Sequence, residues 1–266
     1  MLQGALHIHS TYSDGEFSLA ELRELFLAAG CRFACITDHA DAFASDATPL
    51  DAYRLECESR SDERFRFVAG LEYTCVDRMH VLGYGVTTPI HSADPQQVIR
   101  RIGELGGLAV IAHPKDTAFA AIERFDPLPD GIEVWNSKYD GRYAPRPGTF
   151  ALLARARARR TDMRAFYGQD LHWRRQYRGL FTMVDSATLE RNAILAALAA
   201  GRFSGLKDGQ LLPSDGLVAP SLLASFERVH QRSQRMRTWA RRIKVWLEGA
   251  GIGVPRPVKA RLRRIF

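Results

Sequence analysis

Short apolar runs alternate along the chain with amphipathic segments of about a dozen residues. Strands are predicted over residues 4–9, 32–37, 65–74, 79–85, 108–112, 131–136, 163–168 and 180–184. Helices are predicted over 18–29, 49–60, 95–105, 147–160 and 188–200. Strands that alternate with helices of this length are typical of βαβ units and of a largely parallel sheet. About seven such units before residue 206 favour an α/β barrel over an open sheet.

The charge is divided unevenly along the chain. The 266 residues carry a formal net charge of +7, but residues 221–266 hold 12 Lys and Arg against 2 Asp and Glu. That tail therefore contributes +10, and the preceding residues contribute −3. Because the body is slightly acidic, any argument for nucleic acid or a membrane concerns the basic tail alone.

Composition narrows the class of protein. A hydrophobic fraction of 46% and a charged fraction of 25% are ordinary for a globular chain. The opening residues, MLQGALHIHS, have neither the basic nor the apolar region of a secretory signal. The four cysteines form no C-x-x-C pair, so we expect free thiols and a cytoplasmic protein.

Histidines and carboxylates gather at the ends of the predicted strands. Side chains two residues apart on a strand face the same way, so His7 and His9 project together. Imidazole and carboxylate are the ligands of zinc, manganese and iron. Nine such groups exceed what one ion needs, so we expect two or three ions. The nine are His7, His9, Asp14, His39, Glu72, His80, His113, Asp170 and His172.

The alternative interpretation is that these histidines are core residues. A single buried histidine is more often a satisfied core residue than a ligand, and one H-x-H pair is a weak signal. Burying so many polar groups without partners would cost several kcal/mol each. The set as a whole therefore favours a metal centre.

The stretches LHIHSTYSDG, ITDH, GLEY, HVLGYG, AHP and a late D-x-H resemble, in this order, the PHP (polymerase and histidinol phosphatase) superfamily. The resemblance covers about residues 4–205 and is strongest to small stand-alone metal-dependent phosphoesterases. It implies a distorted (β/α)7 barrel over residues 1–205. Residues 206–266 would then form a linker, 206–220, and a basic, helical C-terminal extension.

The resemblance also implies how the ligands divide. One ion would take His7, His9, Glu72 and Asp170. A second would take Glu72, His80 and His113, with Glu72 bridging. A third would take Asp14, His39 and His172. Many relatives have histidine at the position of Asp14, whereas phosphoesterase-like members often have aspartate.

The expected function is hydrolysis of a small-molecule phosphate ester, a monoester or a nucleotide-like compound, by a water that the ions activate. Glu72 and Asp14 are the expected catalytic carboxylates, and Lys115 and then Arg142 the preferred cations for the phosphoryl oxygens. Lys138, Arg174 and Arg175 are further candidates, Asp38 is expected to orient His39, and His91 and His230 are expected at the surface. Alternatives are a nuclease, a hydrolase of non-phosphate esters or amides, and a metal-dependent scaffold.

The basic tail admits three interpretations. Met236, Trp239, Ile243 and Trp246 share one face of a helix expected over 221–249, and arginines occupy its other faces. The helix could dock on the barrel with its charges in water, anchor the protein to anionic lipid, or, less favoured, bind nucleic acid. Val258, Leu262 and Ile265 form a second apolar stripe. No obligate protein partner is expected.

Overall fold

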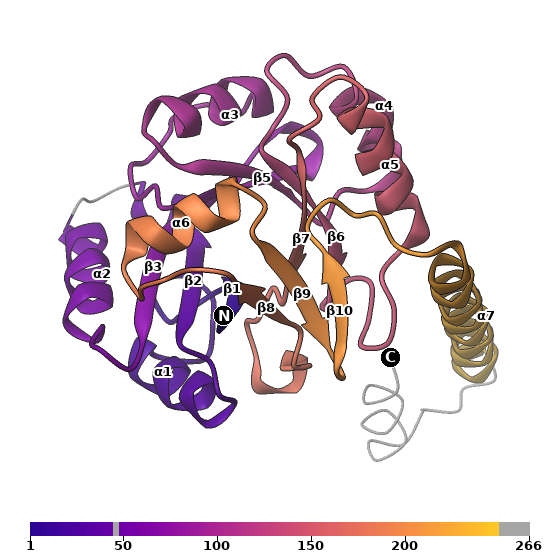
Figure 1. Cartoon of the computed structure of the whole chain (residues 1–266). Coiled ribbons are helices and arrows are strands. Elements are labelled where there is room, and N and C mark those ends of the chain that lie inside the picture. The colour runs from indigo at the N-terminus through magenta and orange to yellow at the C-terminus, as the bar shows by residue number, and fades with distance from the viewer. Residues whose placement is uncertain (45–47, 250–266) are drawn as a thin grey trace.

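A ten-stranded sheet curls into a nearly closed barrel in the computed structural model, which describes residues 1–44 and 48–249 (Figure 1). The strand order is β10-β9-β8-β1-β2-β3-β4-β5-β6-β7. The strands are β1 (Leu2–Ile8), β2 (Phe33–His39), β3 (Arg66–Thr74), β4 (His80–Tyr84), β5 (Leu108–Ala112), β6 (Gly131–Asn136), β7 (Arg164–Gly168), β8 (Phe181–Val184), β9 (Phe203–Lys207) and β10 (Gln210–Pro213). The predicted α/β barrel is confirmed.

The barrel closes between β1 and the segment that follows β7. The backbone N–H of Gln169 donates to the Leu6 carbonyl at 3.0 Å, and the N–H of Leu171 donates to the His7 carbonyl at 3.3 Å. The N–H of His9 in turn donates to the Leu171 carbonyl at 3.0 Å. This closure brings the late D-x-H stretch beside the first two histidines.

The sheet is less parallel than the pattern predicts. Strands β1–β2–β3 and β5–β6–β7 are parallel, but β4 runs antiparallel to both β3 and β5, and β8, β9 and β10 are also antiparallel. Only residues 75–79 connect β3 to β4, which is too short for the crossover that a parallel pair needs. The reversed strand places His80, its first residue, at the same rim as the end of β3.

Helices cover the outside of the barrel. Figure 1 shows α1, α2, α3 and α5 around the curled sheet. Ser18 caps α1 in a capping box with Glu21, as predicted. The predicted helix over 147–160 ends at Arg157, and the one over 188–200 begins at Arg191. The helices are α1 (Leu19–Ala28), α2 (Thr48–Ser59), α3 (Pro95–Glu104), α4 (Phe119–Ile122), α5 (Pro147–Arg157), α6 (Arg191–Ala199) and α7 (Pro220–Gly249).

The segment 206–220, predicted to be a linker, is partly sheet instead. β9 extends to Lys207 across the expected boundary at 205, and β10 pairs with it antiparallel. Asp208 and Gly209 form the turn between them, both with positive φ. An Asp-Gly pair is a strong signal for such a tight hairpin, and it was available in the sequence.

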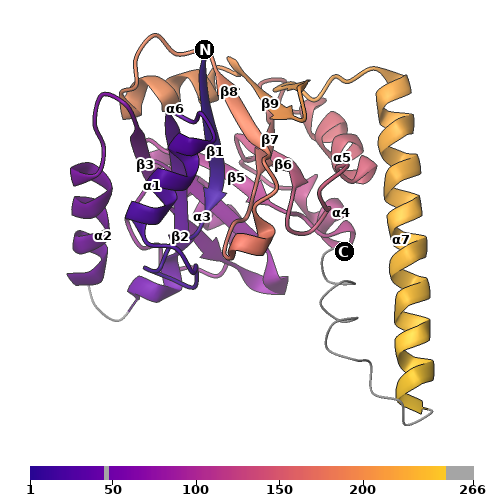
Figure 2. The same cartoon turned by 90° about the horizontal axis from the view of Figure 1, so that it is seen from below.

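The helix expected over 221–249 is present as α7, and its N-terminal part docks on the barrel. Phe226 is 5% exposed, and its ring lies 6.1 Å from Trp135 and 6.4 Å from Phe150. In Figure 2, β1 runs downward from the N-terminus and α7 runs the same way beside the barrel, ending below it. Trp239 and Trp246 are 66% and 68% exposed.

One prediction for the tail falls on residues that the structure does not describe, and one finding concerns membrane-spanning helices. The second apolar stripe of Val258, Leu262 and Ile265 lies outside the described residues. Within residues 1–44 and 48–249, no helix is long and apolar enough to cross a membrane.

Replacing Phe226 with alanine tests how α7 is held. Because its ring is buried against Trp135 and Phe150, we expect Phe226→Ala to lower the free energy of unfolding by about 3 kcal/mol. Trp239→Ala on the exposed side should change it by less than about 0.5 kcal/mol. Urea unfolding measures both, and tryptic cleavage within α7 should become faster only in Phe226→Ala. Equal stabilities would show that α7 does not depend on this contact.

Candidate metal centre

All nine predicted histidines and carboxylates meet at one rim of the barrel. They come from the end of β1, the loop after it, the ends of β2 and β3, the start of β4, and the segments after β5 and β7. A register shift between Ala5 and Ile8 in β1, with His7 at φ 59°, lets His7 and His9 both approach Glu72. His113 and Asp170 also have positive φ, which costs free energy in residues other than glycine.

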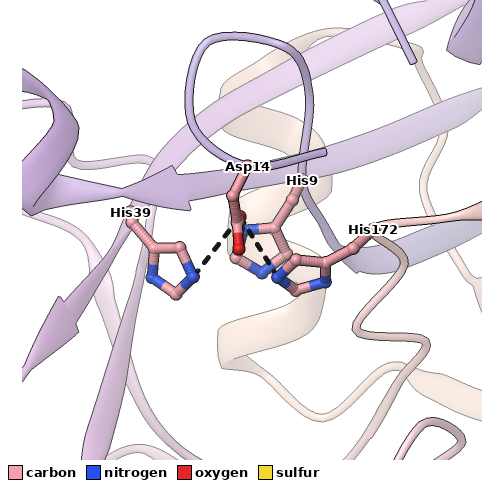
Figure 3. Close-up of side chains that lie close together, drawn as sticks. All are labelled: His9, Asp14, His39 and His172. Atoms are coloured by element: carbon pink, nitrogen blue, oxygen red, sulfur yellow. Dashed lines mark ion pairs between the residues drawn. The ribbon is translucent and has the colours of Figure 1, made fainter. Parts of the chain in front are cut away.

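One cluster combines three histidines with Asp14 (Figure 3). The Asp14 Oδ1 atom lies 3.2 Å from His172 Nε2, 3.6 Å from His39 Nε2 and 3.9 Å from His9 Nδ1. One ligand atom from each of the four residues falls within 4.8 Å of the others. The structure therefore adds His9 to the set expected for a third ion.

Glu72 is the centre of the remaining clusters. Its carboxylate oxygens lie 3.5 Å from His7 Nε2, 3.2 Å from His9 Nε2 and 3.3 Å from His113 Nε2. They also lie 2.7 Å from His80 Nδ1 and 3.3 Å from His39 Nδ1. A carboxylate surrounded in this way has the placement of a bridging ligand.

Two further ligand groups share His7. One joins His7 with Glu72 and His113, and the other joins His7 with His9 and Asp170. His80 reaches the centre through its contact with Glu72 and belongs to none of the three groups with mutually close ligand atoms.

The imidazole nitrogens test whether a metal fits. His7 Nε2 and both ring nitrogens of His9 are buried and make no hydrogen bond, although carboxylates face them. Buried polar atoms without partners are costly, and a divalent cation is the natural partner for nitrogens that face carboxylates. The His, Asp and Glu clusters fit divalent metal binding.

Burial and charge set the protonation of the ligands. Burial holds the pKa of His9 at about 3, so this imidazole is neutral and ready to ligate. Burial also tends to lower the pKa of His7, but Glu133 and Asp170 outweigh it and hold that pKa well above the ordinary value. Despite burial, His7 and hydrogen bonds from histidines hold the pKa of Glu72 well below its usual range.

Glu133 is a site residue that the sequence analysis missed. Its Oε1 atom lies 2.8 Å from His7 Nδ1, and its Oε2 atom accepts from the His113 backbone N–H and the Asn136 side chain, both at 2.9 Å. A Cβ at Gly168 would lie 1.7 Å from Glu133 Oε1, so only glycine fits there. The signal in the sequence was a lone carboxylate inside the apolar strand GIEVWN.

Asp38 does not orient His39 as expected. Neighbouring residues on β2 point to opposite faces, and Asp38 instead accepts from the Ser10 backbone N–H at 2.7 Å and from Ser10 Oγ at 2.6 Å. It also accepts from Ser13 Oγ at 2.5 Å. The buried carboxylate therefore fixes the loop that carries Asp14.

The cations proposed for the phosphoryl group are placed differently from one another. Lys138 reaches the centre, with Nζ 2.9 Å from Asp170 Oδ1 and 3.3 Å from His172 Nδ1. Lys115 is exposed and lines a cleft of about 440 Å³ beside His113. Arg142 is exposed, with its guanidinium 5.8 Å from the centroid of the Tyr143 ring.

The other candidates lie at the surface. The guanidiniums of Arg174 and Arg175 lie over the rings of Phe17 and Trp173, at 4.8 and 4.7 Å. His91 is exposed as expected, whereas His230 is half-buried on α7.

Comparison with known proteins gives similarity in sequence and in fold. No family model matches the chain. A stretch of 78 residues is 36% identical to the DNA polymerase/3'-5' exonuclease PolX of Bacillus subtilis, covering 27% of this chain and 14% of that protein.

Two solved structures share the fold. A two-domain protein from Bacteroides vulgatus, containing a predicted PHP-like metal-dependent phosphoesterase, aligns with a TM-score of 0.58 and 17% identity. That alignment covers 79% of this chain and 66% of that one. PsfC from Pseudomonas syringae aligns with a TM-score of 0.52 and 16% identity, covering 87% and 98%.

Glu133→Gln should weaken metal binding without removing a ligand. The substitution keeps the shape of the side chain but removes the negative charge facing His7 Nδ1, and losing such a partner lowers metal affinity about 10- to 100-fold. Titration of chelator-treated protein with Zn²⁺ or Mn²⁺ measures this. Glu104→Gln, at an exposed ion pair with Arg101, is the matched control. Equal affinities in the two variants would contradict the role given to Glu133.

Metal binding should release protons. Neighbouring carboxylates outweigh burial and raise the pKa values of His7 and His113, which favours their protonated forms in the metal-free protein, whereas ligation requires both rings neutral. Metal affinity should therefore rise with pH above neutrality. Calorimetry in buffers of different ionisation enthalpy should report roughly one to two protons released at pH 7. A binding enthalpy independent of buffer would show that both histidines are already neutral.

Proposed function

We propose that the chain is a member of the PHP superfamily and a metal-dependent phosphoesterase acting on a small phosphate ester. One observation carries the proposal: nine ligand-type side chains converge at the barrel rim, and three of their buried imidazole nitrogens have no hydrogen-bond partner. Two or three ions of zinc, manganese or iron suit such ligands.

The ligands divide among the ions as follows in this proposal. Asp14, His39 and His172 would hold one ion together with His9. Glu72, His7, His113 and Asp170 would hold the others, and His80 would support them through its contact with Glu72. Divalent ions in these positions supply charge that lowers the pKa of water and neutralises phosphoryl oxygens.

Lys138 supplies the protein's own positive charge to the phosphoryl group. Burial tends to lower its pKa, but Asp170 outweighs burial and raises it, so the ammonium stays charged. Its Nζ lies between Asp170 and His172, one residue from each of two proposed ion sites. Such a fixed charge stabilises the transition state, in which negative charge spreads over the phosphoryl oxygens. Lys115, on the cleft beside His113, is the second candidate.

A nuclease is the second candidate function. The 78-residue similarity to a protein named DNA polymerase/3'-5' exonuclease favours it. Phosphodiester hydrolysis could use the same ions and the same cations. Its substrate differs in that the phosphorus carries a second ester group, which stays on the product.

A panel of substrates tests both candidates. Protein loaded with Mn²⁺ or Zn²⁺ should release phosphate from small monoesters, and Glu72→Gln should lower kcat at least about 100-fold because the shared ligand is weakened. Lys138→Ala should lower kcat/KM about 10- to 100-fold through loss of one charge-assisted contact. Lys115→Ala should have the smaller effect.

The panel also contains bis-p-nitrophenyl phosphate, single-stranded DNA and an aryl ester, each with and without chelator. Preferred cleavage of DNA would favour the nuclease, and turnover of the aryl ester alone would favour an esterase. Protein that binds metal but hydrolyses none of these substrates would overturn the proposed function.

A further inference from the structure

Three arginines from three parts of the chain gather on the loop that follows β6. Arg178, between η4 (Arg174–Gln176) and β8, donates to the carbonyl of Ser137. Arg237, on α7, places Nη2 within 3.7 Å of the position that a Cβ would take at Gly141. Arg142 is the next residue of the same loop.

Within the described part of the chain, these guanidiniums have no acidic partners. Among the described residues, no Asp or Glu oxygen lies within the 4.0 Å of an ion pair from any of the three. Arg146, close by, shows the contrast, because it pairs with both Asp140 and Asp116. Burial, with repulsion from Arg237 and then Arg142, lowers the pKa of Arg178, so the three charges lie close enough to repel one another.

The loop on which the three arginines gather also carries Lys138 into the metal centre. Ser137, which receives the hydrogen bond from Arg178, directly precedes Lys138, and adjacent Cα atoms are about 3.8 Å apart. Lys138 itself contacts Asp170 and His172. Figure 2 shows that α7 runs along the barrel toward the rim that β1 points to, which is how a residue in the middle of this helix reaches the loop.

We propose that Arg142, Arg178 and Arg237 form a second anion-binding subsite, which takes a phosphate group of the substrate other than the one that is hydrolysed. Repelling cations held beside an active site are costly unless an anion joins them, and the planar guanidinium matches phosphate in two hydrogen bonds. The substrate class is therefore a phosphate ester that carries a second phosphate. This identification of the substrate rests on the proposed function, and it makes the C-terminal helix part of the substrate site.

Matched substrates test the subsite. 1,3-Propanediol bisphosphate and its monophosphate differ only in the second phosphate. Arg237→Ala should lower the ratio of their kcat/KM values, bisphosphate over monophosphate, about tenfold, as expected for one charge-assisted contact. Arg235→Ala, an exposed arginine two residues away on another face of α7, should leave the ratio unchanged. An equal effect of both substitutions, or of neither, would overturn the subsite.

Binding of inorganic pyrophosphate separates the subsite from the proposed function. Calorimetry on chelator-treated full-length protein should show pyrophosphate affinity falling about tenfold in Arg237→Ala and in Arg142→Ala, but not in Arg235→Ala. Arg142 is exposed, so its variant keeps the test usable if Arg237→Ala loosens α7. Weaker binding in both variants without any turnover supports the subsite while the phosphoesterase fails. Affinity unchanged in both variants overturns the subsite whatever the activity.

Discussion

The buried carboxylate of Glu72 is the constraint around which the rim of the barrel is organised. It is 1% exposed, and five imidazoles from three strand ends and one strand start face it. An isolated ionised carboxylate in such a place would be very costly. The fold therefore has to surround this carboxylate with cationic side chains or a metal ion. Only a barrel that closes brings such partners together from distant strands. The backbone bonds between β1 and the segment after β7 provide that closure and bring Asp170 and His172 to the same point.

The support around the ligands is as specific as the ligands themselves. The Glu133 carboxylate contacts Nδ1 of His7 and orients its ring. Position 168 needs glycine because the same carboxylate occupies the space that a Cβ would take. His7, His113 and Asp170 keep positive φ values that the surrounding packing has to maintain. Backbone strain of this kind persists where the structure over-determines a conformation, and such places cluster at functional sites.

The sequence contained most of this site because ligands at strand ends follow from a period of two residues and from element order. The barrel and the meeting of His9 with His172 could be predicted from these features alone. The antiparallel direction of β4 was not predicted, although residues 75–79 are too short a connection for a parallel pair. The preference for Lys115 and Arg142 over Lys138 was a choice between surface charges. Which of these cations reaches the ligands depends on the path of the loop after β6, and no local sequence pattern predicts that path.

The basic tail carries its charge on a helix with two different faces. Eleven residues, about three turns, separate Phe226 from Arg237, so both point toward the barrel. Trp239 and Trp246 lie on another face, and both are exposed. A docked helix and an anion-binding helix are therefore compatible, because the docking contact is what presents Arg237 to the loop. The lipid-anchor interpretation concerns the tryptophan face and stays a prediction.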